Sequence, residues 1–417
     1  MIEPLLDGLR LDSRVREAAR RAAHWLERRD PRNAAVRSRV LRAFIDEGIA
    51  ESDLAGTTGY GYDDAARERY ESLLARVLRA ERVLARLSIV SGTHAIVAGL
   101  DALVPPGGTL LAANGAPYDT LRNAIVNAPW SLTSRGVRYA EVPRDPRGGT
   151  DLDALRDAAH ELRPDVVFAQ RSRGYAARRS LTIEAIGELV RAVREAHPGA
   201  LIFVDNCYGE LVEEREPLEA GADVIAGSLI KNLGGGLAPA GGYLAGDARA
   251  IERIAARVYA PGLGAALGPT LGFGRAFVQG VFYAPLVVAE TLRGLDFTAA
   301  LFEDLGFAVD PRPGETRTDI VQAIRLGAPE PLVAFARGLQ RAMPVNARFA
   351  PEPGAVPGYA DPVIMSAGAF VAGATIELSC DAPLRAPYEV YVQGGVMAEH
   401  AALGAIFAAE AVLAASR

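Results

Sequence analysis

The sequence predicts an α/β fold, a mostly parallel sheet of seven strands sandwiched by helices, followed by a smaller α+β domain. Between residues 87 and 258, strand-like apolar runs alternate with amphipathic helical patterns, which is typical of parallel sheets with helices on both faces. Beyond about residue 296 the alternation stops, and a Pro- and Gly-rich stretch precedes further strands and a long final helix. A chain of 417 residues is long enough for two such domains.

The N-terminal segment, residues 1–50, is rich in Arg and Ala. Its periodicity predicts amphipathic helices, for example at 13–27 and 34–47. A Gly- and Tyr-rich segment follows, and Asp63 or Asp64 at its end can cap a further helix at 65–86.

The large domain, residues 51–295, contains the alternating elements. Its predicted strands are 87–90, 109–113, 137–142, 165–170, 201–205, 224–228 and 241–245, and the helices between them are 94–103, 118–128, 151–161, 183–197 and 248–258. The C-terminal domain, residues 296–417, has predicted strands at 320–324, 363–367 and 374–379 and a helix at 397–415. Since ligands of parallel sheets bind outside the carboxyl ends of the strands, polar residues directly after strands are the candidates for a site.

Composition argues against several classes of protein. A net charge of −6 gives no general attraction to nucleic acid or to an anionic membrane. We find no apolar run suited to span a bilayer and no signal-peptide pattern. Two cysteines and five scattered histidines predict neither a disulfide framework nor a metal site, and they fit a cytoplasmic protein.

Lys231 is the most informative residue, because it is the only lysine among 45 lysine and arginine residues. Arginine stays protonated, whereas a desolvated lysine can lose its proton and form a Schiff base with a carbonyl. A surface lysine that has survived by chance is the alternative. The setting favours chemistry instead, because Ser228 precedes Lys231 by three residues and Gly234–Gly236 follow it closely. We interpret this as a crowded anion site in which Ser228 reaches a phosphate and the glycines allow close approach of the backbone.

Ser91, Gly92 and Thr93 lie between a predicted strand and a predicted helix. Free N–H groups at a helix N-terminus bind phosphate, and a glycine there permits close approach. Gly92 and Thr93 are the expected donors. An ordinary turn capped by Ser91 or Thr93 is the alternative interpretation.

Asp205 and Tyr118 also follow strands. Asp205 ends a buried strand 26 residues before Lys231, where a carboxylate can pair with a protonated pyridinium nitrogen. Tyr118 can stack on a planar cofactor ring or act as an acid toward a leaving group. The alternatives are an aspartate that caps a turn and a tyrosine that packs in the core.

Taken together, these segments resemble one family. The segments are 57–64, 91–95, 117–120, 170–175, 204–210 and 227–232, and 383–388 also fits. The chain is similar over essentially its whole length to the methionine γ-lyase-like family often called aluminium resistance protein. That name describes a phenotype and implies no aluminium site.

The resemblance implies a fold-type I pyridoxal-phosphate (PLP) enzyme related to the cystathionine and methionine γ-lyases, which are usually homotetramers built from dimers. It makes Lys231 the Schiff-base lysine, Asp205 the partner of the ring nitrogen and Tyr118 the stacking ring. The full set of expected cofactor residues is Tyr60, Tyr62, Ser91, Gly92, Thr93, Tyr118, Asp205, Ser228 and Lys231.

Two departures from the family pattern concern binding residues. In the true γ-lyases a Tyr-x-Arg pair from the neighbouring subunit grips the phosphate, whereas here Tyr60-Gly61-Tyr62 contains no Arg. Those lyases also bind the substrate carboxylate with an Arg in a strand that here reads Ile376–Ser379. Arg173 and Arg385 are the candidates for that task, because a planar guanidinium suits bidentate binding of a carboxylate.

We therefore expect a cytoplasmic homo-oligomer that acts on an amino acid as a carbon–sulfur lyase, by β- or γ-elimination. An aminotransferase, or another lyase such as a desulfhydrase or an aldolase, is the alternative within PLP chemistry. Outside it, a nucleotide-binding oxidoreductase could use Gly234–Gly246, but the first strand–helix turn lacks Gly-x-Gly-x-x-Gly. A non-catalytic scaffold with the same fold would leave Lys231, Asp205 and Tyr118 without a function.

Overall fold

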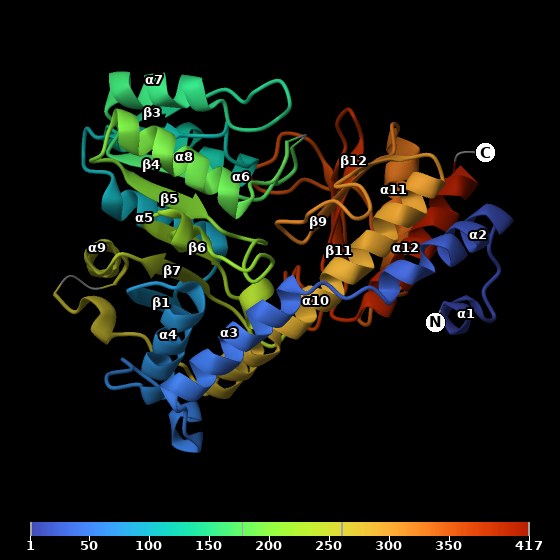
Figure 1. Cartoon of the computed structure of the whole chain (residues 1–417), viewed down its shortest axis with the longest axis horizontal. Coiled ribbons are helices and arrows are strands. Elements are labelled where there is room, and N and C mark those ends of the chain that lie inside the picture. The colour runs from blue at the N-terminus through green and yellow to red at the C-terminus, as the bar shows by residue number, and fades with distance from the viewer. Residues whose placement is uncertain (1, 177, 260–261, 416–417) are drawn as a thin grey trace. The chain divides into compact units, whose positions relative to one another are not determined.

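The structure is a computed structural model that describes residues 2–176, 178–259 and 262–415. It divides into two compact units (Figure 1). Unit 2 comprises Ala35–Phe282, and unit 1 joins the first 34 residues to the chain from Tyr283 onward. Helices α3 (Arg32–Glu47) and α10 (Gly274–Asp304) each contribute residues to both units.

Unit 2 is built on a seven-stranded sheet of order β1-β7-β6-β5-β4-β2-β3. The strands are β1 Arg82–Arg86, β2 Thr109–Ala112, β3 Arg138–Glu141, β4 Val166–Gln170, β5 Leu201–Asp205, β6 Val224–Ser228 and β7 Gly242–Gly246. Only β7 runs antiparallel to its neighbours, and the other pairs are parallel. The predicted mostly parallel sheet is therefore confirmed.

Helices cover both faces of this sheet (Figure 1). They are α4 Ala65–Leu78, α5 Gly92–Leu103, α6 Asp119–Arg122, α7 Leu152–Leu162, α8 Ile183–Ala196 and α9 Ala248–Val258, with short turns η2 Glu51–Leu54, η3 Asn123–Asn127, η4 Thr133–Arg135, η5 Pro217–Ala220, η6 Asn232–Gly234 and η7 Gly264–Ala266. α5 and α9 pack together over an apolar core that includes Phe168, Phe203 and Leu244. A Cβ on Gly99 would lie 2.6 Å from the Phe203 ring, so this glycine lets α5 approach the sheet closely.

Three neighbouring strands end together at the carboxyl edge of the sheet. Gln170 at the end of β4 pairs in register with Asp205 at the end of β5. Asp205 in turn lies opposite Ala226, two residues before the end of β6 at Ser228. Since α5 begins at Gly92 and packs against β6, its N-terminus reaches the same edge.

Unit 1 is built on a five-stranded antiparallel sheet of order β10-β11-β12-β9-β8. Its elements are α1 Glu3–Leu6, α2 Ser13–Ala22, η1 Ala23–Leu26, β8 Ala308–Asp310, β9 Val321–Arg325, α11 Pro329–Gln340, β10 Val363–Ala367, β11 Ser379–Pro383, β12 Glu389–Gln393 and α12 Ala398–Ala415. α11 and α12 pack against each other.

Among the described helices, α12 is long and apolar enough to cross a membrane by length and composition. The expectation that no apolar run suits a bilayer is wrong on that criterion. More than half of α12 is nevertheless buried inside the fold, and it packs against α11 as a core helix of unit 1.

The N-terminal segment 1–50 does not form a separate region as the sequence suggested. Its first 34 residues belong to unit 1, because the Asp12 backbone N–H donates to Glu410 (2.7 Å) and Arg21 pairs with Asp304 (2.5 Å). The other boundary of unit 2 lies inside α10, at 282–283 and not at 295.

Three predicted elements were misplaced. The helix predicted at 65–86 ends at Leu78, because Arg79 adopts the left-handed conformation (φ 59°) and closes the last turn. Strand β1 then occupies the next residues, and the predicted strand 87–90 is a turn. In unit 1 the strand predicted at 374–379 begins only at Ser379.

Candidate active site

The N-terminus of α5 forms a cradle at the carboxyl edge of the sheet. Ser91 is the N-cap, and its hydroxyl accepts a hydrogen bond from the His94 N–H at 3.1 Å. The N–H groups of Gly92 and Thr93 lie in the first turn, where the helix supplies no acceptor. A Cβ on Gly92 would lie 3.2 Å from both Cys207 Sγ and Ser228 Cβ, so only glycine keeps this approach open.

The Ser228 hydroxyl lies beside that cradle at the end of β6. Ser228 is buried, and within the described residues its hydroxyl forms no hydrogen bond. Two helix N–H groups and one hydroxyl therefore lie close together at this edge of the sheet, and such a donor set suits a phosphate.

Tyr118 is fixed next to this cradle. Its hydroxyl lies 2.7 Å from Thr93 Oγ1, and its backbone N–H donates to Gln170 Oε1 at 3.0 Å. Burial, and secondarily the charge of Asp205, raise the pKa of Tyr118 well above its usual value, so the phenol keeps its proton at neutral pH. Sequence reasoning did not assign Gln170 this positioning role, although Gln170 ends the strand beside Asp205.

Asp205 is buried at the end of β5, and its Oδ1 accepts a hydrogen bond from the Cys207 backbone N–H at 3.1 Å. Burial raises the pKa of Asp205, and the positive charge of Lys231 opposes that rise. Asp205 is thus held rigidly and needs a cationic partner to remain ionised.

Lys231 lies three residues beyond β6, at the start of the short turn Asn232–Gly234. Its Nζ lies 3.7 Å from the centroid of the Tyr208 ring. Burial by itself lowers the pKa of Lys231, but Cys207, Tyr208, Asp205 and Tyr118 outweigh it and leave the pKa well above its usual value.

The glycines after Lys231 form a tight turn. A Cβ on Gly234 would clash with the Leu229 carbonyl, and Gly235 and Gly236 are left-handed (φ 52° and 79°). We predicted that these glycines let the backbone pass close to a ligand. The structure shows that the turn itself already requires them.

The two candidate arginines lie in different units. Arg173 is buried in unit 2, and its backbone N–H donates to Ser180 Oγ at 3.0 Å. The loop after Arg173 passes Tyr118, since a Cβ on Gly174 would lie 3.6 Å from Tyr118 Cβ. Arg385 follows β11 in unit 1, where its side chain is 37% exposed and lies 3.6 Å from Asp361.

Tyr60 and Tyr62 are exposed, at 72% and 49% of their surface, and their ring centroids lie 5.9 Å apart. Their loop is firmly anchored in unit 2. The Gly268 N–H donates to the Tyr60 carbonyl at 2.9 Å, and the buried carboxylate of Asp64 accepts from the Thr57 N–H and hydroxyl. In the single chain, this aromatic pair is held in a fixed place with its rings in solvent.

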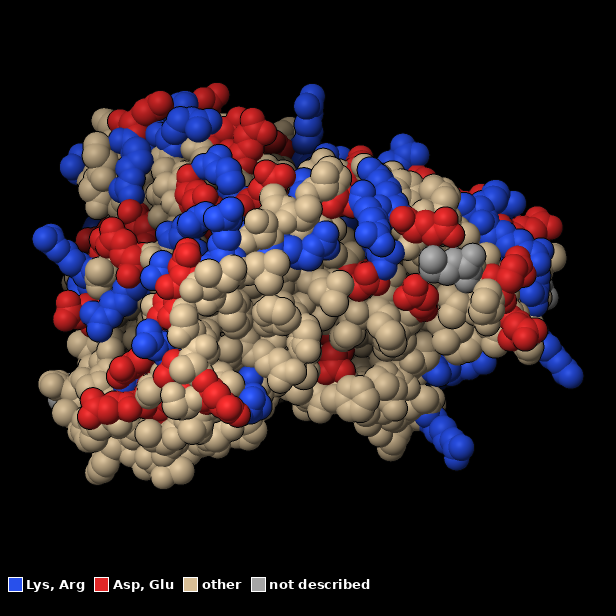
Figure 2. All heavy atoms as spheres, turned by 60° about the horizontal axis from the view of Figure 1, so that its bottom comes forward, with Lys and Arg blue, Asp and Glu red and all other residues tan. Residues whose placement is uncertain are grey.

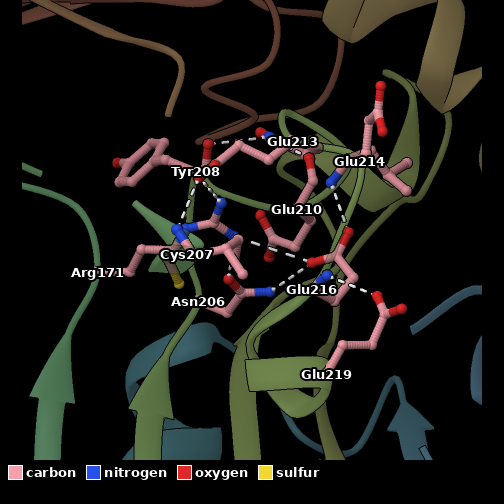
Figure 3. Close-up of polar contacts among 12 residues, drawn as sticks. Arg171, Asn206, Cys207, Tyr208, Glu210, Glu213, Glu214, Glu216 and Glu219 are labelled. Atoms are coloured by element: carbon pink, nitrogen blue, oxygen red, sulfur yellow. Dashed lines mark hydrogen bonds and ion pairs between the residues drawn. The ribbon is translucent and has the colours of Figure 1, made fainter. Parts of the chain in front are cut away.

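A buried polar network lies directly after Asp205 in the chain, and sequence reasoning did not foresee it (Figure 3). Arg171, fully buried, donates to Asn206 Oδ1 at 2.7 Å and pairs with Glu213 at 3.0 Å. Glu216 is also buried and accepts from Arg39 at 2.9 Å. Arg171 and Asn206 lie inside the motif segments 170–175 and 204–210, whereas the other members lie outside them, and spacing alone does not reveal their burial.

Glu210 belongs to the same region. It is fully buried, and Tyr243 donates its hydroxyl hydrogen bond to Glu210 Oε1 at 2.9 Å. Burial raises the pKa of Glu210 to about 8, so it is mostly protonated at neutral pH.

The residues at this edge fit PLP. The α5 N-terminus and Ser228 offer phosphate donors, Asp205 offers a buried carboxylate for the ring nitrogen, and Lys231 offers the amine. Within the ranges described, no group of three or more His, Cys, Asp or Glu side chains could hold a metal ion.

Comparison with known proteins also supports a PLP-dependent enzyme. The sequence model described as methionine gamma-lyase matches residues 11–413. The uncharacterized protein YnbB of Bacillus subtilis is 44% identical over 367 residues, which is 87% of each chain.

Solved structures are also similar. A carbon–sulfur lyase involved in aluminum resistance from Clostridium novyi NT superposes with a TM-score of 0.91 at 38% identity, covering 98% of this chain and 97% of its own. The pyridoxal-5'-phosphate-dependent protein YhfS of Escherichia coli shares the fold, with a TM-score of 0.62 at 20% identity over 97% of this chain and 98% of its own.

Proposed function

The chain belongs to the methionine gamma-lyase family of PLP-dependent enzymes, and we propose that it cleaves a carbon–sulfur bond of an amino acid. One observation carries the proposal. The only lysine of the chain lies partly buried at the carboxyl edge of the sheet, where the charge of Asp205 acts on it and where α5 begins. The resemblance detected in the sequence is thereby confirmed at the level of family and cofactor class.

Several residues would hold the cofactor. The first-turn N–H groups of Gly92 and Thr93 and the hydroxyl of Ser228 would bind its phosphate. Asp205 would keep the ring nitrogen protonated, because its burial leaves it in need of a cationic partner. When bound, PLP supplies the electron sink for negative charge that develops at the substrate Cα.

Lys231 and Tyr118 would move the protons. The Lys231 amine would remove the Cα proton of the substrate. Tyr118 stays a neutral phenol at neutral pH, so its hydroxyl has a proton to donate to a departing thiolate. The net reaction consumes one amino acid and one water and yields a thiol, a keto acid and ammonia.

The substrate carboxylate needs a cationic partner. Arg173 lies in the unit that contains Lys231, on the loop that passes Tyr118. Arg385 lies in unit 1, and its side chain is partly exposed. Both arginines are candidates for the carboxylate ligand, because each carries the planar guanidinium that suits bidentate binding.

We also propose a cytoplasmic homo-oligomer. Large apolar side chains of unit 2 are exposed, including Ile45 (77%), Tyr60 (72%) and Leu271 (53%). Figure 2 shows a face on which broad areas carry neither acidic nor basic side chains. Such surfaces on a soluble enzyme are commonly covered by another subunit.

The reaction type can be tested by mixing the enzyme with sulfur-containing amino acids and measuring keto acid, thiol and ammonia. Elimination yields all three without an added amino acceptor. An aminotransferase would yield keto acid only when an acceptor keto acid is present, and that result would replace our proposal. A Lys231→Arg variant is the matched control, because it keeps the charge and cannot form the Schiff base.

A further inference from the structure

Tyr208 is the residue in contact with the Lys231 amine in this structure. Lys231 Nζ lies 3.7 Å from the centroid of its ring, well within the range of a cation–π contact. Tyr208 also has a left-handed backbone (φ 72°), which is sparsely populated by bulky residues. An aromatic residue persists in such a conformation only where its surroundings hold it there.

Asn232, the residue after Lys231, helps to hold the Tyr208 backbone in this conformation. Asn232 is fully buried, and its Nδ2 donates to the Tyr208 carbonyl at 3.0 Å and to the Glu210 carbonyl at 2.8 Å. The short turn that follows Lys231 therefore also fixes the backbone of Tyr208, whose ring contacts the lysine. Any shift of one loop would be transmitted to the other.

The buried polar network around Arg171 and Glu216 also fixes the loop that contains Tyr208 (Figure 3). The Gly209 N–H donates to the Asn206 carbonyl at 3.0 Å, and a Cβ on Gly209 would lie 2.5 Å from Arg171 Nη1. Glu216 accepts from the Leu211 N–H at 3.0 Å, and Leu211 is itself left-handed (φ 63°). The loop that presents Tyr208 is thus fixed on both sides by groups that water does not reach.

We propose that Tyr208 is a positioning residue for Lys231, whose ring holds the amine whenever it is not joined to the cofactor. The inference rests on the proposed function for the role of Lys231, and on the ring contact for the role of Tyr208. A free lysine has a flexible four-carbon stem, so an unheld amine would sample many positions. The ring face keeps Nζ in one of them and favours the ammonium form that exists once the amine has accepted a proton.

The other groups that act on Lys231 are a carboxylate, a phenol and a thiol. Asp205, Tyr118 and Cys207 all influence its protonation, but among the described residues Tyr208 is the one whose ring face lies at contact distance from Nζ. Tyr208→Leu removes the π face and keeps an apolar side chain. Tyr208→Phe keeps the π face and removes only the hydroxyl, and it is the matched control.

The single lysine makes a direct measurement possible. In full-length protein labelled with ¹³C-lysine, Lys231 gives the only lysine side-chain signal. We expect, in protein stripped of cofactor, an upfield ring-current shift of its ε protons and an NOE to the Tyr208 ring. Tyr208→Phe keeps the shift, whereas Tyr208→Leu loses it and lowers the proton affinity of the amine by about tenfold.

The spectrum of the wild-type protein decides the matter even if Tyr208→Leu does not fold. A random-coil shift for Lys231 without an NOE to an aromatic ring would overturn the proposal. An unchanged shift and titration in a folded Tyr208→Leu protein would do the same. Borohydride fixation of PLP to Lys231 in the holoenzyme tests the proposed function separately, so failure of one claim is distinguishable from failure of the other.

Discussion

Two parts of unit 2 that we expect to meet the cofactor are built in opposite ways. Around Lys231, Asp205 and Tyr118 the functional side chains are largely buried and have hydrogen-bond or charge partners within the same unit. Tyr60 and Tyr62 stand on an equally well anchored loop, but their rings are exposed. The side chains of the first region have their partners within one chain. The rings of Tyr60 and Tyr62 would contact a cofactor only if another subunit packed against them.

The largest effect is expected in the buried region. Asp205→Asn should retain PLP but lose activity by on the order of a thousandfold or more, because asparagine cannot keep the ring nitrogen protonated. Steady-state rates and the visible absorbance of the bound cofactor check both parts. Near-normal turnover of the variant would mean that Asp205 has only a structural role, as acceptor of the hydrogen bond from the Cys207 N–H.

The exposed region should show its effect only across subunits. Replacing Tyr60 and Tyr62 together by Phe removes two hydroxyls, and loss of two hydrogen bonds to a charged phosphate costs about 3 kcal/mol or more. We expect weaker cofactor binding by about a hundredfold. Mixing this variant with inactive Lys231→Ala should restore part of the activity, since mixed dimers would contain one intact site.

Two results would argue against a shared site. One is a protein that stays monomeric at assay concentration. The other is a mixture without recovered activity despite proven exchange of subunits. Either result would mean that Tyr60 and Tyr62 belong to an exposed turn that binds no phosphate. The absence of the Arg of the family pattern would then be explained.

The anchor of the exposed loop gives a smaller effect on stability. Asp64 is buried, and burial raises its pKa, but hydrogen bonds from Thr57, Arg67 and Thr270 outweigh this and lower the pKa from 3.8 to about 2. A lowered folded-state pKa contributes stability above pH 4 that disappears as the pH falls toward 2. Asp64→Asn should therefore lose about 2 kcal/mol of unfolding free energy at pH 7 and less in acid.

Chemical denaturation of wild type and Asp64→Asn at several pH values checks the sign. The difference between the two proteins should shrink between pH 4 and pH 2. A difference that stays constant with pH would mean that the carboxylate of Asp64 contributes no more than a neutral amide at this position.

The smallest expected effect separates the two arginines. The Lys variant of the arginine that binds the carboxylate should raise KM about tenfold, equivalent to ~1.4 kcal/mol, with kcat less affected, because lysine cannot bind a carboxylate bidentately. We expect this effect in only one of the two variants, Arg173→Lys and Arg385→Lys. Steady-state kinetics of both variants identify the ligand, and an unchanged KM in both would exclude both arginines.

The large sheet was predicted well because its signals are local. The strands 201–205 and 224–228 and the helix 248–258 agree with β5, β6 and α9, since each apolar run is bounded by residues of a different kind. β1 was misplaced because Arg82–Arg86 continues the pattern of the helix before it. Only the left-handed Arg79 separates the two elements, and no local residue type signals it.

In the candidate site, residue identity predicted the chemical groups but not their supports. Lys231 and Asp205 stood out by rarity and by position after strands. The contact of Lys231 with Tyr208 depends on a left-handed backbone that no propensity predicts. Arg171 and Glu216 lie far apart in the sequence, and their burial follows only from the packed fold.

The central claim is that Lys231 holds PLP. Borohydride reduction of the purified holoenzyme followed by peptide mapping tests it most directly, because Lys231 and the N-terminal amine are the only primary amines available. We predict a yellow protein in which reduction fixes the cofactor on the peptide that contains Lys231. A protein that contains PLP and leaves Lys231 unmodified after reduction would contradict the account.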